Sequence, residues 1–186
     1  MSGSFIRSTL PAVALIACVL VSLLAAPGAE GLNGAFLAAL MLAIMVSDAE
    51  RYIIPNELTA AAIALALLRA ATIGPDAGWI GIAWSFARAA SVALPLLGLM
   101  AGYRRWRGRD GLGLGDVKLA AVAGAWLGWS MIFAVLELAA LAALGVYLLV
   151  AILRRKSLKG TAFLPFGAFL APCIWLGWLA EAMLAR

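Results

Sequence analysis

Histidine is absent from this sequence of 186 residues, and cysteine is rare. Without imidazole the chain has no Ser-His or Cys-His catalytic pair and lacks the commonest metal ligand. The two cysteines, Cys18 and Cys173, lie inside apolar runs and form no CxxC pair. The sequence therefore indicates neither a zinc site nor a disulfide framework. We expect no metal and no cofactor, so any catalysis depends on carboxylates, lysine or hydroxyl groups.

Charge is also scarce. Only 12% of the residues are charged and 66% are hydrophobic, whereas a soluble domain carries about 25% charged residues. This composition is too apolar to cover a water-soluble globule, and the long uncharged runs are typical of membrane spans. We predict an all-α, polytopic transmembrane bundle in which an N-terminal helix and loop (1–31) precede a six-helix core (32–186). The expected segments are 10–26, 32–47, 58–73, 79–103, 117–127, 130–153 and 163–184.

The fifth segment is short for a membrane span at about 1.5 Å per residue. We expect it to be lengthened by residues of 113–129 or to tilt with its partner. The start of the chain allows two interpretations. Arg7, the apolar run and the small residues before Pro27 also resemble a signal peptide. If it were cleaved, a six-helix core with the same orientation would remain.

Basic residues predict the orientation. If the seven segments alternate, nearly all Lys and Arg residues fall on one side, and the connectors around Glu30, Asp76 and Gly128 carry none. Arg186 is the exception. The positive-inside rule then places the N-terminus in the cytoplasm and the C-terminus in the periplasm. This placement also explains the net charge of +5 without a nucleic-acid partner.

Two aspartates lie at segment ends on the predicted cytoplasmic side. Asp48 closes the second segment and Asp116 opens the fifth. Two carboxylates at one level can share a proton, so that one acts as a base toward water and the other as an acid toward a carbonyl. That is aspartyl-protease chemistry. Alternatively, Asp116 is a helix N-cap and Asp48 an ordinary interfacial residue. The glycines at 111, 113 and 115 give a backbone that a substrate strand can approach, or form a plain loop.

These residues carry a family resemblance. Gly113-Leu114-Gly115-Asp116, followed by Val117-Lys118-Leu119, resembles the GxGD signature of type IV prepilin peptidases. Asp48 followed by Ile54-Pro55-Asn56 is similar to the family's other motif. The late segment around Pro165-Phe166-Gly167 and the run from Gly124 to Gly128 also fit. Three motifs in order on a matching helix pattern are specific, and the resemblance covers the chain from Leu32 onward.

The resemblance implies an integral-membrane aspartyl endopeptidase of the bacterial inner membrane. Such enzymes cut the short basic leader from pilin-like or pseudopilin precursors at the cytoplasmic face. The catalytic aspartates carry over to Asp48 and Asp116. The residues expected to shape the site or bind substrate are Gly113, Gly115, Lys118, Pro55, Asn56, Pro165 and Gly167. Long members also carry a methyltransferase domain with two CxxC pairs. This chain has none, so it resembles the short, peptidase-only form, and we expect no methylation.

Two rival functions remain at this stage. An intramembrane protease of the presenilin kind also uses GxGD, but there Tyr precedes the first aspartate and the late motif is Pro-Ala-Leu. Here Ser47 precedes Asp48, and Pro165 begins Pro-Phe-Gly. A proton-coupled transporter would use the aspartates as a relay. Against it, neither aspartate lies near the predicted midplane, and the sequence contains no internal repeat. The sequence indicates no oligomeric state.

The other charges have structural interpretations. Arg88 and Glu137 lie at similar predicted depths, and we expect them to form a buried ion pair. Arg69 is expected to snorkel to the interface. Lys118 either biases the proton of the aspartate pair, binds a precursor or anchors the cytoplasmic side. The tryptophans are expected at segment ends, as an aromatic belt. Three further acids either meet the basic leader or are solvated: Glu50, Glu57 and Asp110.

Overall fold

The computed structural model describes residues 2–108, 111, 113–153 and 164–185. Within these ranges the chain forms seven helices and no strand. Four of them, α2, α4, α6 and α7, are long and apolar enough to cross a membrane. The helices are α1 (Ser2–Ala25), α2 (Ala29–Arg51), α3 (Asn56–Thr72), α4 (Trp79–Arg107), α5 (Leu114–Trp126), α6 (Trp129–Leu153) and α7 (Gly167–Leu184).

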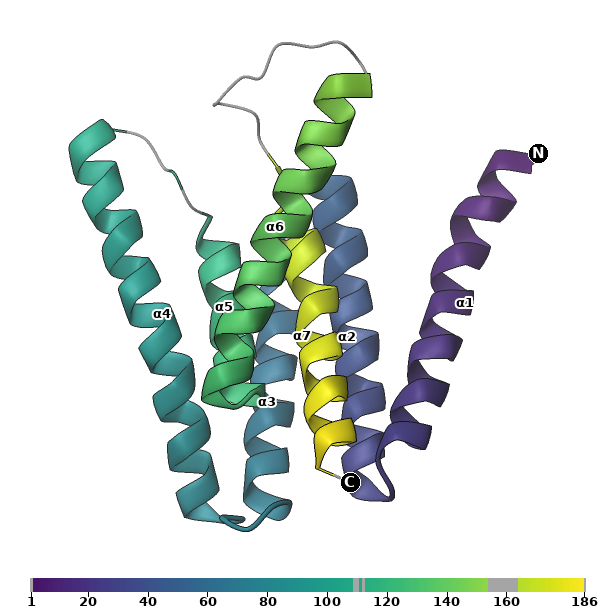
Figure 1. The fold of residues 1–186 in the computed structure, drawn as a ribbon, viewed down its shortest axis with the longest axis vertical. Coiled ribbons are helices and arrows are strands. Elements are labelled where there is room, and N and C mark those ends of the chain that lie inside the picture. The colour runs from purple at the N-terminus through teal and green to yellow at the C-terminus, as the bar shows by residue number, and fades with distance from the viewer. Residues whose placement is uncertain (1, 109–110, 112, 154–163, 186) are drawn as a thin grey trace.

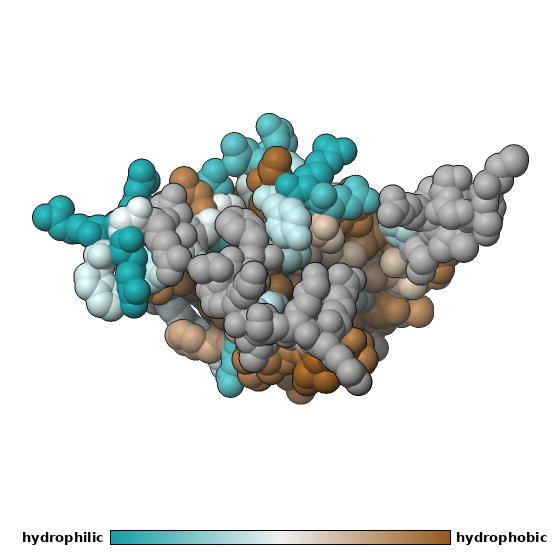
Figure 2. Space-filling model, turned by 90° about the horizontal axis from the view of Figure 1, so that it is seen from above, coloured by the Kyte–Doolittle hydropathy of each residue, from teal (hydrophilic) through white to brown (hydrophobic). Residues whose placement is uncertain are grey.

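The helices run alternately up and down, which confirms the predicted all-α bundle (Figure 1). The N-terminus and the C-terminal ends of α2, α4 and α6 lie at one end of the molecule, and the C-terminus lies at the other. The last turn of α4 carries Arg104, Arg105 and Arg107, and the last turn of α2 carries Arg51. We call this the basic end and the opposite one the far end. Seen from the basic end, hydrophilic side chains gather on the surface (Figure 2).

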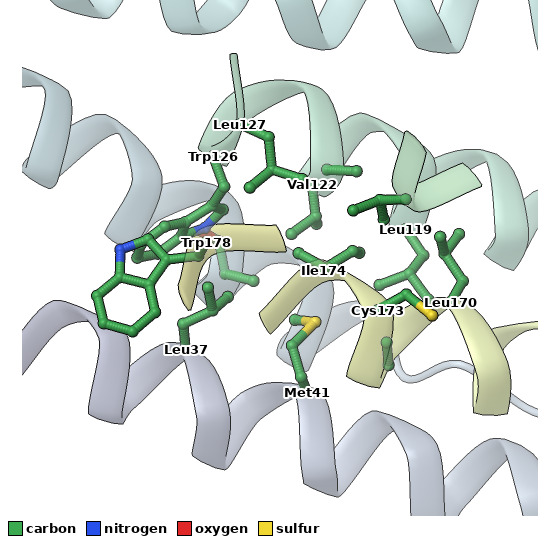
Figure 3. Close-up of a cluster of buried hydrophobic side chains, with 14 of the residues drawn as sticks. Leu37, Met41, Leu119, Val122, Trp126, Leu127, Leu170, Cys173, Ile174 and Trp178 are labelled. Atoms are coloured by element: carbon green, nitrogen blue, oxygen red, sulfur yellow. The ribbon is translucent and has the colours of Figure 1, made fainter. Parts of the chain in front are cut away.

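An apolar layer fills the bundle between the two ends. Leu37 and Met41 of α2 face Leu119 and Val122 of α5 and Ile174 of α7, and all five are at most 1% exposed (Figure 3). These side chains pack tightly because small residues of α5 let the neighbouring helices approach it closely. A Cβ at Gly124 would lie 2.7 Å from the carbonyl oxygen of Arg88 in α4. α5 is consequently enclosed by its neighbours.

The short α5 ends inside the bundle. It is lengthened as predicted, but only at its start, where Leu114, Gly115 and Asp116 join the helix. Figure 1 shows that the turn between α5 and α6 does not reach the level of the α3–α4 turn. The last carbonyls of a helix lack intrahelical partners, and in a membrane they must be satisfied by the protein. Ser85 of α4 donates to the Ala125 carbonyl at 2.7 Å, and Arg88 Nε donates to that of Gly124 at 3.3 Å.

Arg69 completes this cap. Its Nη1 donates to the Trp126 carbonyl at 3.3 Å, and its Nη2 lies 2.8 Å from Oε1 of Glu30 in α2. Cations at a helix C-terminus also interact favourably with the helix dipole. On the other side of the turn, the Gly128 amide donates to Glu181 at 2.8 Å. We call these side chains the far-end cap: Glu30, Arg69, Ser85, Arg88 and Glu181.

Two sequence-based expectations about charged residues fail here. Arg69 does not snorkel, because Glu30 and the α5 carbonyl hold it inside. Arg88 does not pair with Glu137. It contacts the Gly124 carbonyl and interacts with Glu181, while Glu137 is exposed on α6.

Two tryptophans depart from the expected aromatic belt. Trp126 and Trp178 are at most 1% exposed, and both donate hydrogen bonds inside the bundle. Their indoles bond the Ala62 carbonyl and Glu30, respectively, at 2.9 Å. A buried indole N–H needs such a partner. These two side chains are therefore core residues.

Candidate active site

Asp48 lies in the last turn of α2 at the basic end, and it is 5% exposed. Its Oδ2 accepts a hydrogen bond of 2.8 Å from the amide of Ala168, and the Gly167 amide also donates to this carboxylate. Both donors belong to the free N-terminal turn of α7, where backbone amides lack intrahelical partners and attract anions. The chain leaves α2 through Tyr52 in the left-handed conformation, with φ 56°. Asp48 is thus an enclosed carboxylate held by backbone donors.

Asp116 occupies the first turn of α5. Gly113 is the N-cap, and its backbone forms a hydrogen bond with the Asp116 carboxylate. A side chain at the third helical position that reaches back to the N-cap amide is one half of a capping box. Asp116 is therefore not itself the N-cap, which was one of the alternatives from sequence. The capping bond leaves part of the carboxylate available for chemistry.

The two aspartates are electrostatically coupled. Burial, and then the charge of Asp48, raise the pKa of Asp116 to about 6, against the opposing effect of the Gly113 hydrogen bond. Like charges in close proximity disfavour double ionisation. Such a pair keeps one shared proton at pH values where a lone surface aspartate has already lost its proton. One carboxylate and one carboxylic acid is the charge state that acid–base catalysis by two carboxyl groups requires.

Ile54 fills the space between the two aspartate-bearing segments. A Cβ built at Gly115 would lie 3.1 Å from Ile54 Cβ. A Cβ at Gly167 would lie 2.5 Å from Ile54 Cδ1 and 2.9 Å from Asp48 Oδ2. A side chain at Gly167 would displace Ile54 or the carboxylate, and one at Gly115 would press on Ile54. Ile54 was not among the residues predicted from the sequence to shape the site, although it belongs to the Ile-Pro-Asn motif.

The remaining predicted residues lie around this contact. Pro55 is the N-cap of α3, and Asn56 is its first residue. Asn56 Oδ1 accepts a hydrogen bond of 2.7 Å from Lys118 Nζ, which ties the start of α3 to α5. The Pro165 carbonyl accepts from the Ala168 amide at 3.2 Å, and so helps to form the turn that precedes α7. The structure thus brings all three motifs together at the basic end.

Several predicted features lie outside this cluster. Glu50 and Glu57 are exposed at the basic end. Asp110 lies outside the described residues, as does Leu112. Among the residues that the structure describes, no group of three His, Cys, Asp or Glu side chains is placed to hold a metal ion. The two aspartates and the backbone amides around them are therefore the groups available for chemistry.

The model of the type IV leader peptidase family matches residues 35–155, a range that includes both aspartates. The chain belongs to the type IV leader peptidase family. Membership confirms the resemblance found in the motifs. Together with the four apolar spans, it indicates a multi-pass protein of the bacterial inner membrane.

Relatives of this leader peptidase family member are named prepilin leader peptidase/N-methyltransferase. The one from Aeromonas hydrophila is 28% identical over 94% of this chain and 59% of its own length. The one from Klebsiella pneumoniae is 35% identical over 67% of this chain and 53% of its own. The one from Pseudomonas aeruginosa is 32% identical over 78% of this chain and 48% of its own length. The chain thus spans about half of the relatives' length. No solved structure matches it.

Proposed function

We propose that this protein is a membrane aspartyl endopeptidase that removes the short basic leader from pilin-like or pseudopilin precursors. Residues 32–186 would form the peptidase core, and 1–31 would add a helix at its edge. The observation that carries the proposal is the coupled pair of Asp48 and Asp116 at the basic end. Family membership supports the reaction type, because the named relatives are leader peptidases.

The environments of the two aspartates suggest different roles. Two backbone amides donate to Asp48, and these bonds offset part of the cost of burying its ionised form. Asp116, with a pKa of about 6, then holds the shared proton. Asp48 takes a proton from a water molecule while the oxygen of that water bonds to the scissile carbonyl carbon. At the same time Asp116 protonates the carbonyl oxygen, which gives a diol. On collapse of the diol, Asp48 gives its proton to the departing amine, and Asp116 recovers one from the diol hydroxyl.

The neighbours of the pair suggest how a substrate is held. Gly113 and Gly115 present bare backbone beside Asp116, so an extended peptide can approach closely. Lys118, through Asn56, would fix the start of α3 against α5 and so keep Ile54 in place. Pro165 and Gly167 would set the α7 amides on Asp48. The leader's basic residues would be received at the cytoplasmic face, with the N-terminus of this protein on the same side.

The apolar layer argues against a proton relay. Between the aspartates and the far-end cap lie five buried apolar side chains, Leu37, Met41, Leu119, Val122 and Ile174, whose packing Figure 3 shows. A relay needs a chain of polar groups or water across the membrane. Along this path the described side chains are apolar and closely packed, so we favour the peptidase over the transporter.

Purified protein in detergent, mixed with a pilin precursor, tests the proposal. Wild-type protein should release the leader, and Asp48→Asn and Asp116→Asn should each abolish release while the protein stays folded. Asp76→Asn is the matched control, because Asp76 is exposed between α3 and α4, away from the pair. Cleavage by either site variant at more than a trace would refute the two-aspartate mechanism. Failure of the wild-type protein on all precursors would refute the function.

A further inference from the structure

Glu137 is an acidic side chain in the middle of α6. It is exposed and takes part in no hydrogen bond or ion pair with the residues that the structure describes. The other deep charges are satisfied by the chain itself. Glu30 pairs with Arg69, Arg88 bonds a carbonyl, and Glu181 bonds an amide. Glu137 therefore differs from Glu30, Arg88 and Glu181, which the chain itself satisfies.

Contacts between α6 and α7 fix the depth of Glu137. The Cβ position of Gly177 meets Val135 Cγ2 and Met131 Cγ, so Gly177 lies level with the middle of these two residues. At about 1.5 Å per residue, Glu137 is then about 9 Å below Gly167 at the active site and about 16 Å from the far end of α7. A membrane has a hydrocarbon core about 30 Å thick. Glu137 thus lies well inside it.

The face around Glu137 is otherwise apolar. Phe133, Leu141 and Leu144, one or two helical turns away, are 66%, 59% and 51% exposed. The buried residues of α6, among them Val135 and Ala139, lie on the opposite side of the helix. A carboxyl group in the middle of a face that lipid chains would cover is costly, and such residues almost always face protein or a water-filled cavity. Another protein surface must therefore cover this face.

We propose that this face of α6 packs against the same face of a second copy of the chain, and that the two Glu137 carboxyl groups hydrogen-bond each other across a two-fold axis. We call it the α6 face: Phe133, Ala134, Glu137, Ala140, Leu141 and Leu144.

The α6 face complements itself chemically. A carboxylic acid is both donor and acceptor, so two copies satisfy each other without any further side chain. In a two-fold interface a residue near the axis meets its own copy. The other members of the face are apolar and match one another in the same way. Ala134 and Ala140, one turn on either side of Glu137, are exposed and small, which allows the two helices to approach closely.

Self-association in lipid vesicles tests this proposal. Full-length protein labelled with donor and acceptor dyes should show energy transfer that falls only on strong dilution with lipid. Glu137→Leu should weaken association about tenfold, as expected for the loss of an interhelical hydrogen bond. Glu137→Gln should retain association, since an amide also donates and accepts. Near-ultraviolet circular dichroism, which reports the packed Trp126 and Trp178, shows that each variant is folded.

Cysteine cross-linking locates the contact. In a background with Cys18 and Cys173 replaced by alanine, Leu144→Cys should form a disulfide-linked dimer on mild oxidation. Leu149→Cys should not, although Leu149 is equally exposed at 55%, because it lies far round the helix. A wild-type monomer, a Glu137→Leu variant that associates as well as wild type, or preferential linking through position 149 would each overturn the proposal. So would a different membrane protein bound on this face.

Discussion

The Asp48 carboxylate accepts a hydrogen bond of 2.8 Å from the amide of Ala168, a residue 120 positions further along the chain. The bond joins the last turn of α2 to the first turn of α7. Because the donors are main-chain groups of a helix terminus, their direction is fixed by the fold rather than by a side-chain rotamer. Small changes at this junction should therefore affect activity more than stability.

Gly167→Ala tests this junction. The new methyl group would meet Ile54 Cδ1 and Asp48 Oδ2, and a displaced catalytic group can cost about 100-fold in rate. We expect cleavage of a precursor to fall by this order while the melting temperature changes little. Ile54→Val removes the Cδ1 atom and should restore part of the activity. Gly145→Ala, where nothing lies within 4 Å, is the control; equal losses at both glycines would contradict the contact.

The coupling of the aspartates predicts a shift in chemical labelling. A carbodiimide modifies protonated carboxyl groups, so Asp116 in wild-type protein should be half labelled near its pKa of about 6. Asp48→Asn removes the neighbouring charge, and the midpoint should move to lower pH. It should stay above 3.8, the ordinary value, because burial is the larger cause of the shift. Peptide mass spectrometry measures the modification, with Glu57 as an exposed internal control. An unchanged midpoint would show that the two groups do not interact.

The far-end cap predicts a strong energetic coupling. Glu30→Gln and Arg69→Met should each lower the free energy of unfolding by about 2–3 kcal/mol, less than for a fully buried pair, because these side chains are 20% and 26% exposed. Arg69→Met should cost more, since it also frees the Trp126 carbonyl. The double variant should lose less free energy of unfolding than the sum of the two single losses. Substitutions of Arg88 and Glu137, which are not in contact, should have additive effects. Denaturation in mixed micelles measures these values, with Arg105→Met as an exposed control.

The proposed orientation is tested with single cysteines in the background lacking Cys18 and Cys173. A cysteine at position 107, at the basic end, should resist a membrane-impermeant thiol reagent in intact cells and react after lysis. A cysteine at position 76, at the opposite end, should react in intact cells. The reverse pattern would place the aspartates on the periplasmic side and exclude cleavage in the cytoplasm.

The helices were predictable because their apolar runs are long and their ends are marked by charge, glycine or proline. The placement of Asp48 and Asp116 at one end followed from the same alternation. The partner of Arg88 was not predictable, because it is a main-chain carbonyl, a group that every residue carries. Ile54 was missed for a related reason. An apolar side chain in a membrane protein has the same sequence signature whether it faces lipid or packs against the glycines beside two aspartates.

The apolar layer bears on the electrical insulation of the membrane. It consists of Leu37, Met41, Leu119, Val122 and Ile174. A hydrolytic site must admit water, and in an energised membrane any aqueous path that continued to the other side would discharge the ion gradient. Here the hydrocarbon seal lies within the protein, beneath the aspartates. The site can therefore be wet on one side while the membrane remains electrically insulated, and even abundant copies of the protein should add no measurable proton conductance.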